Sequence, residues 1–173
     1  MRGQYNVRER VIVLPTPKVY LESTMFNFYY ADDAPEKKQD TLAMFDEIKE
    51  CKYEPYTSFV TVDEISRTAD EQKRERMLAL ISEYDIGVLE DDSEADVLAD
   101  IYVREGIIPE KYRDDALHIA VAAIAEMHII LSWNFQHIVK RKTRNMVNAV
   151  NLREGYRTIE ICSPKEVIES EAE

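Results

Sequence analysis

Short apolar runs alternate with longer amphipathic segments along most of the chain. The short runs are partly β-branched, as strands buried on both faces of a parallel sheet often are. Strands are predicted at residues 19–21, 86–89, 129–131 and 158–162, with a weaker one near Tyr56. Strands that alternate with helices predict an α/β fold, here a three-layer α/β/α sandwich around a mainly parallel, Rossmann-like sheet. In such sheets, ligands bind beyond the carboxyl ends of the strands.

Capping residues and prolines mark where the intervening helices begin and end. Gly106 and Gly155 suit helix ends. A further strand at residues 11–14 would be separated from the rest by Pro15 and Pro17. The predicted helix starts are Asp33 with Pro35, Ser58, Asp70, Ser93 with Asp96, Asp114 or Asp115, Lys142, and Ser163 with Pro164 and Glu166.

The length of 173 residues suits one domain with a sizeable core. We expect an N-terminal extension (1–17), a folded domain (18–168) and a short acidic tail (169–173).

Two widely separated cysteines, outside any metal-ligand spacing, are expected to be reduced. No apolar run approaches the roughly 20 residues of a membrane span, and the polar N-terminus lacks the features of a signal peptide. These features predict a cytoplasmic protein without a membrane segment.

The chain is strongly acidic. Its 34 Asp and Glu residues against 22 Lys and Arg residues give a net charge of −12. A field of this sign repels a phosphate backbone, which excludes a protein that holds nucleic acid by its overall charge. It leaves room for a local acidic cluster in which a metal ion reverses the sign.

Oxygen-bearing side chains stand near the ends of the predicted strands. Glu22 follows the first strand, and Glu64 lies in a short helix after the second. Asp115 opens the helix before the strand at 129–131, and Asn134 follows that strand. Residues so far apart in the chain can meet at the carboxyl edge of one sheet. Because oxygen ligands without cysteine or paired histidine favour Mg²⁺ or Mn²⁺ over zinc, the pattern indicates a carboxylate metal site.

Each of these residues also has an ordinary structural explanation. Glu22 could lie at the surface or cap the next helix. Glu64 could be a solvated helix charge, and one of Asp114 and Asp115 could be only a helix cap. Asn134 could cap the short helix that follows it. The case for a metal site therefore rests on the four positions together.

The sequence resembles the PIN-domain family of metal-dependent ribonucleases, which includes the toxin halves of bacterial and archaeal toxin–antitoxin pairs. The matching segments are residues 18–27, 63–65, 115–120 and 132–135. The first and third segments are the most specific. Their order and spacing extend the resemblance over most of the chain.

The resemblance implies a role for each matching residue. Glu22, Glu64 and Asp115 correspond to the acidic metal ligands of the family. Many members have Asp followed by a small hydroxyl residue at the first position, and Ser23 keeps the hydroxyl here. Asn134 stands where active members often have Asp, and it would hold a water or a second metal ion. The catalytic set is thus Glu22, Glu64, Asp115 and Asn134, and the supporting set is Ser23, Asn27, Asp114, His118 and Ser132.

Two neighbouring side chains are expected to be structural. His118 lies among apolar residues, so we expect a buried, hydrogen-bonded histidine rather than a metal ligand. Trp133 is expected to pack in the core rather than to stack on a nucleic-acid base.

The family resemblance implies a Mg²⁺- or Mn²⁺-dependent endoribonuclease that leaves a 5′-phosphate. Its implied partners are an RNA substrate, a small antitoxin protein and a second copy of the chain. Against the acidic background, the densest positive run would contact RNA phosphates, although such a run can equally be a solvated loop and helix start. This run consists of Lys140, Arg141, Lys142 and Arg144.

Two other functions stay open at this stage. The chain could be a non-catalytic interaction module of the same fold, in which Glu22 and Asn134 mark lost activity. It could also be a metal-dependent phosphohydrolase acting on small phosphoesters. A chain with only 4 glycines and no GxxxxGK pattern does not favour nucleoside triphosphates as substrates.

Overall fold

A five-stranded parallel sheet forms the centre of the protein. The structure is a computed structural model that describes residues 15–171, with the side chains of residues 15–168. The strand order is β3-β2-β1-β4-β5, and every neighbouring pair is parallel. The predicted parallel sheet is confirmed. Its strands are β1 (Lys18–Leu21), β2 (Glu54–Ser58), β3 (Gly87–Leu89), β4 (Ile129–Leu131) and β5 (Glu160–Cys162).

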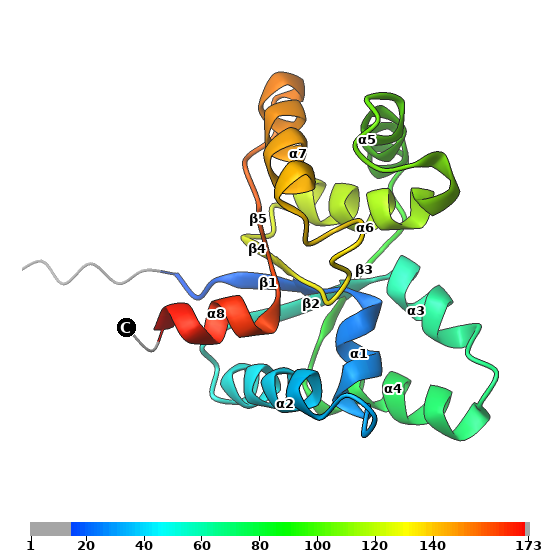
Figure 1. Cartoon of the computed structure of the whole chain (residues 1–173), viewed down its shortest axis with the longest axis vertical. Helices are drawn as coiled ribbons and strands as arrows, with labels where there is room; N and C mark the ends of the chain where they lie inside the picture. Colours follow the sequence, from blue (N-terminus) through cyan, green and yellow to red (C-terminus); the bar gives the residue numbers. More distant parts are fainter. Residues whose placement is uncertain (1–14, 172–173) are drawn as a thin grey trace, which may run out of the picture.

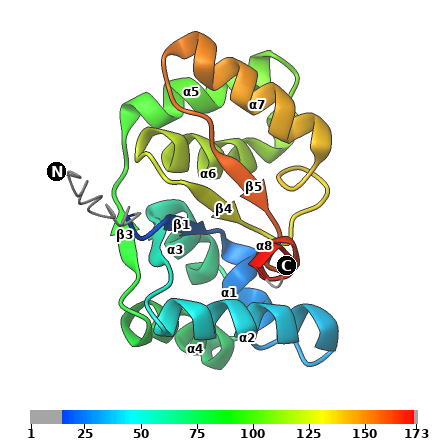
Figure 2. The ribbon, with the colours of Figure 1, turned by 90° about the vertical axis from the view of Figure 1, so that its left-hand side faces the viewer.

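Helices cover both faces of this sheet and complete the predicted three layers. Within the described residues they are α1 (Ser23–Tyr29), α2 (Pro35–Lys49), α3 (Phe59–Ser66), α4 (Glu71–Glu83), α5 (Ser93–Arg104), the 3-10 turn η1 (Glu110–Tyr112), α6 (Arg113–Ile124), α7 (Arg141–Glu154) and α8 (Pro164–Glu171). Figure 1 shows α5, α6 and α7 on one face, with α1, α2 and α4 on the other. The turned view in Figure 2 shows the same separation.

Each face of the sheet has its own hydrophobic core. Tyr102 and Leu98 of α5 pack with α6 and α7 on one side, and Phe26 and Phe45 pack with α4 on the other. Helix α6 is buried at every position from residue 116 to 123. A polar side chain within such a helix needs a partner inside the protein, because leaving it unpaired in an apolar surrounding costs free energy. This requirement applies to one residue of α6, His118.

Several predicted helix boundaries are confirmed. Asp70 caps α4, where its carboxylate accepts a hydrogen bond from the Lys73 N–H at 3.0 Å. Gly155 ends α7 with a left-handed φ of 90°, which glycine adopts without steric cost. At the start of α8, Ser163 and Glu166 exchange hydrogen bonds as a capping box.

Three predicted caps are wrong. The N-cap position of α6 is Tyr112 rather than Asp114 or Asp115, and the other two predictions are wrong by one residue. Helix α2 begins at Pro35 as expected, but its N-cap position is Ala34 rather than Asp33. Helix α5 is capped by Asp92, which accepts a hydrogen bond from its second helical N–H, and not by Ser93. Several candidate capping residues stand side by side in that segment, so a pattern places the helix but not its exact start.

The ends of the chain add little to the fold. The predicted strand at 11–14 lies outside the described residues. Helix α8 continues to Glu171, into the segment predicted as an acidic tail. Across residues 15–171, none of the helices has the length and apolar character needed to cross a bilayer.

The direction in which the sheet grows reverses at β1. Strands β2 and β3 extend the sheet from one edge of β1, and β4 then pairs with its other edge. Such a reversal opens a crevice at the carboxyl ends of the two strands, where α/β proteins bind ligands. Glu22 follows β1 at this point, and its N–H donates a hydrogen bond to the carbonyl of Leu131, the last residue of β4, at 3.1 Å.

Candidate metal centre

Glu22 is buried at the first position beyond β1, with 2% of its surface exposed. Its Oε1 accepts a hydrogen bond from Ser23 Oγ at 2.6 Å. Its Oε2 accepts bonds from the N–H and the hydroxyl of Thr24, and from Ser132 Oγ at 2.8 Å. Glu22 therefore does cap α1, and the alternative that it lies at the surface is wrong. Because Oε1 accepts only one of the four bonds, it keeps a lone pair for a further partner.

Glu64 projects from α3 toward α6. One of its carboxylate oxygens, Oε2, lies 3.2 Å from His118 Nε2. Burial alone would raise the pKa of Glu64, but interactions with His118, Ser23 and Arg67 lower it overall. The side chain is thus held in the ionised form that a metal ligand needs. Its neighbour Asp63 is the solvated helix charge, exposed and paired with Arg67.

His118 occupies the middle of the buried helix α6 and is fully inaccessible to solvent. Its Nδ1 lies 2.7 Å from the hydroxyl of Tyr20, which in turn lies 2.6 Å from Ser58 Oγ. Its Nε2 has no hydrogen-bond partner, because the contact with Glu64 is close enough for an ion pair but lacks hydrogen-bond geometry. The prediction of a buried histidine is confirmed, but only one of its two nitrogens is hydrogen-bonded.

The surroundings of His118 strongly favour positive charge. Burial on its own would lower the pKa of His118, yet Tyr20, Glu64 and Glu22 together raise it well above the usual value. An environment that attracts a proton in this way attracts a divalent cation for the same reason.

Asp115 lies in the first turn of α6 and feels the charge of Glu22 and Glu64, but its carboxylate is not one of the ligand atoms that lie within 4.8 Å of one another. Its pKa is raised from 3.8 to about 6, first by burial and then by the charge of Glu22, with a smaller contribution from Glu64. His118 and a hydrogen bond with Asn134 act in the opposite direction. The part of this rise that comes from Glu22 and Glu64 indicates a repulsion between carboxylates that a cation would relieve.

Asn134 combines a structural role with a place beside this cluster. Its Oδ1 accepts a hydrogen bond from the His137 N–H at 3.0 Å, and its own N–H donates to Ser132 Oγ at 2.9 Å. It therefore caps the turn that follows, and no helix forms there before α7. Its influence on the pKa of Asp115 shows that the side chain also borders the carboxylates.

Next to Asn134, Trp133 is buried and donates a hydrogen bond to Thr41, which confirms the predicted packing role.

Apart from His118, the supporting residues divide into two groups. Ser23 and Ser132 bond directly to Glu22. Asn27 is exposed on α1, and Asp114 is exposed on α6, 3.8 Å from Arg67. Within residues 15–168 we find no contact that joins either of these two side chains to the carboxylates.

The basic run after Asn134 is partly engaged. Arg144 donates hydrogen bonds to both carboxylate oxygens of Glu166, at 2.8 and 3.0 Å, and so connects α7 with α8. Lys140, Arg141 and Lys142 are exposed around the start of α7. These three side chains are the part of the run that is open to solvent.

Some residues of the site could not be recognised in the sequence. Tyr20 reads as an apolar strand residue, and Ser58 was expected to cap α3. Ser58 does stand at the N-cap position, but its hydroxyl bonds to Tyr20 instead of to the helix backbone. The sequence carries no signal for this pairing, because it depends on the register of β1 beside β2.

The donor atoms fit a divalent ion. One ligand atom from each of Glu22, Glu64 and His118 lies within 4.8 Å of the others. Ligands on opposite sides of an ion with bonds of about 2.1 Å are about 4.2 Å apart, so the three can share one ion after small side-chain movements. The buried Nε2 without a hydrogen-bond partner is a further sign of fit, because an unpaired buried nitrogen is otherwise costly.

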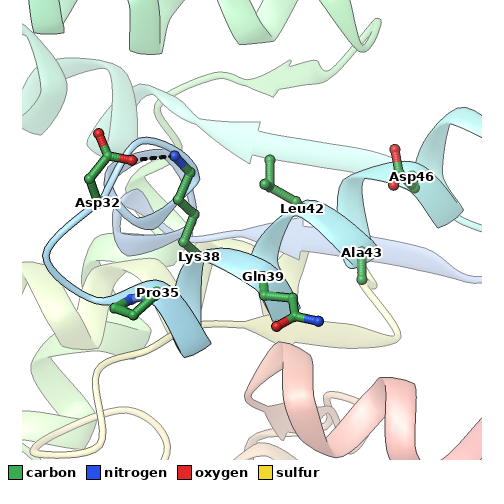
Figure 3. Close-up of a pocket in the computed structure, with 7 residues that line it drawn as sticks. All are labelled: Asp32, Pro35, Lys38, Gln39, Leu42, Ala43 and Asp46. Atoms are coloured by element: carbon green, nitrogen blue, oxygen red, sulfur yellow. Dashed lines mark hydrogen bonds and ion pairs between the residues drawn. The ribbon is translucent and has the colours of Figure 1, made fainter.

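A separate surface cavity of about 400 Å³ lies on α2 and takes no part in this cluster. Figure 3 shows its lining, in which Lys38 pairs with Asp32 above Pro35, with Leu42 to the right of the pair. None of its lining residues belongs to the predicted site. The candidate centre is therefore defined by its polar side chains at the sheet edge and not by this cavity.

Comparison with known proteins supports the fold. No known family profile and no curated protein matches the sequence. Among solved structures, the chain is similar to one in VapBC2 from Rickettsia felis bound to a DNA fragment from their promoter. The two align with a TM-score of 0.52 at 11% identity, over 84% of this chain and 98% of the other. This likeness supports a PIN-like arrangement of strands and helices.

Proposed function

We propose that the protein is a metal-dependent ribonuclease that hydrolyses phosphodiester bonds of RNA at the edge of the sheet. The observation that carries the proposal is the convergence of Glu22, Glu64 and His118 at the switch point of the sheet, with ligand atoms within 4.8 Å. Asp115 adds a third carboxylate, whose pKa is raised first by burial and then by the charge of Glu22. Residues from three separate segments, the end of β1, α3 and α6, thus contribute to one acidic cluster at the place where this fold binds ligands.

In this proposal the side chains of the chain hold Mg²⁺ or Mn²⁺ against an RNA phosphate. Bound there, the ion supplies an activated water and neutralises charge on the phosphoryl oxygens. Glu22 is kept in one orientation by its hydrogen bonds to Ser23, Thr24 and Ser132, which suits a fixed ligand. Asn134 borders Asp115, where its amide can orient a water molecule.

The direct test is cleavage of a circular RNA by the purified full chain. Because a circle has no ends, only an endonuclease linearises it. We expect linear product with Mn²⁺ or Mg²⁺ and none when EDTA replaces the metal. Sequencing of the product ends should then find 5′-phosphates. Cleavage that continues unchanged in EDTA would contradict the proposal.

The exposed basic residues offer a way to hold the substrate. We expect Lys140→Glu combined with Arg141→Glu to weaken RNA binding and to flatten its dependence on salt by about two units of log–log slope, one for each lost phosphate contact. The measurement is RNA affinity over a series of salt concentrations. Charge reversal at Lys49 and Lys52, exposed near the other end of the sheet, is the matched control. An equal effect of both pairs would show that only overall charge matters.

We also propose the partners that this function implies. The similar structure from Rickettsia felis is a VapB–VapC complex. By analogy, the chain would act in the cytoplasm as the toxin of a toxin–antitoxin pair, held by a small antitoxin protein and paired with a second copy of itself.

A non-catalytic interaction module is the second candidate. The observation that favours it is the structural role of Glu22, whose four hydrogen bonds would be made in a helix cap without any metal. The two candidates differ in whether the cluster binds a divalent ion.

A further inference from the structure

We propose that His118 binds the metal ion directly through Nε2, and that the centre therefore selects Mn²⁺ over Mg²⁺. This inference rests on the metal centre of the proposed function and adds a nitrogen ligand to its carboxylates. The starting observation is that Nε2 is buried, faces Glu64 and has no hydrogen-bond partner.

The other side of the imidazole ring is fixed by hydrogen bonding. The Tyr20 hydroxyl lies between Ser58 Oγ at 2.6 Å and His118 Nδ1 at 2.7 Å. A hydroxyl has one proton, so when Tyr20 donates to Ser58 it accepts from Nδ1–H. In that arrangement the proton of a neutral ring sits on Nδ1, and Nε2 carries a lone pair. Metal-bound histidines are held in the same way, with the second nitrogen donating to an oxygen.

The lone pair of Nε2 then faces an ionised carboxylate. Glu64 Oε2 is 3.2 Å away, and the contact lacks hydrogen-bond geometry. Two electron-rich atoms at this distance repel each other unless a cation lies between or beside them. Neighbouring ligands of one ion with bonds of about 2.1 Å are about 3 Å apart, close to the separation observed here. Glu22 supplies a third ligand atom within the same cluster.

A nitrogen ligand changes which metal the centre prefers. Mg²⁺ takes oxygen ligands almost exclusively, whereas imidazole is a common ligand of transition metals. Two carboxylates and one imidazole therefore favour Mn²⁺ over Mg²⁺ more than carboxylates alone would. Without a metal, a proton binds Nε2 in its place and pairs with Glu64, so protons compete with the metal ion for this nitrogen.

Pulsed electron paramagnetic resonance of Mn²⁺ bound to the full chain tests the assignment without any activity measurement. We expect a coupling to ¹⁴N that changes to the ¹⁵N pattern when histidine is labelled with ¹⁵N. We expect the coupling to disappear in His118→Gln, with Mn²⁺ affinity reduced by at least about 100-fold, the upper end of what loss of a residue that only supports a ligand costs. His137→Gln, which alters a histidine stacked on Tyr112, is the matched control and should keep the coupling.

The possible outcomes separate the inference from the function on which it rests. Mn²⁺ bound without nitrogen coupling would overturn the role of His118 and leave the carboxylate centre standing. Coupling that persists in His118→Gln would assign the nitrogen to another residue and would also overturn it. Failure of the wild-type chain to bind Mn²⁺ would overturn both. If the His118 variant does not fold, coupling that persists in both His128→Gln and His137→Gln still assigns the nitrogen to His118, the third histidine of the chain.

Discussion

Asp115→Asn is expected to lower the rate of Mn²⁺-dependent RNA cleavage by at least about 100-fold. Changes to residues that only support metal ligands typically cost 10- to 100-fold, so loss of a carboxylate from the cluster should reach or exceed the upper end of that range. The substitution replaces one oxygen with an amide of the same size, and it removes a charge that is unfavourable without metal. We therefore expect the variant to fold normally, which circular dichroism would verify.

The chain provides a matched control at the preceding residue. Asp114 lies in the same helical turn but is exposed, and it contacts Arg67 rather than the cluster. We expect Asp114→Asn to change cleavage less than about threefold, because exposed ion pairs contribute little. Equal losses in both variants would point to a general charge effect in α6. Unchanged cleavage in Asp115→Asn would contradict the assignment of Asp115.

The fold could be predicted from the sequence because its signals are local. Each strand is a short apolar run, and Asp70 and the Ser163–Glu166 pair mark helix starts by hydrogen bonds within three residues. Because strands alternate with helices along the chain, a parallel sheet with helices on its faces is the simplest arrangement. The predicted capping residue was wrong where two neighbouring residues are both suitable caps, as are Asp92 and Ser93.

The candidate site could be predicted only in part, since it depends on contacts across the fold. Glu22, Glu64 and Asp115 were recognisable because carboxylates at strand ends must share one edge of the sheet. The roles of Tyr20 and Ser58 were not recognisable, because a tyrosine in a buried strand has the pattern of a core residue. The open nitrogen of His118 was missed for the same reason. Its position depends on how α6 packs against β1 and α3, which the sequence of α6 alone does not specify.

Mn²⁺ is expected to raise the melting temperature of the full chain by about 5–10 °C. At a free concentration 100-fold above Kd, a ligand that binds only the folded state adds about 2.7 kcal/mol to the free energy of unfolding. For a chain of this size each kcal/mol corresponds to about 2–4 °C. Differential scanning fluorimetry at increasing Mn²⁺ concentration measures the shift. An interaction module without a metal centre would show none, so this measurement separates the two candidate functions.

The same shift should depend on pH, because protons and metal compete for Asp115. Its pKa of about 6 means that the carboxyl is largely protonated at about pH 5 and ionised at about pH 7.5, so at one Mn²⁺ concentration the shift should be larger at the higher pH. Without metal the pH dependence has the opposite sign, because the melting temperature then falls as the pH rises. A carboxyl whose folded pKa is raised above 3.8 loses its favourable contribution to stability as the pH rises toward 6. Asp115→Asn should remove both dependences on this carboxyl and melt at a higher temperature than wild type when both are metal-free near pH 7. A Mn²⁺ shift of equal size in Asp115→Asn would show that Asp115 does not take part in metal binding.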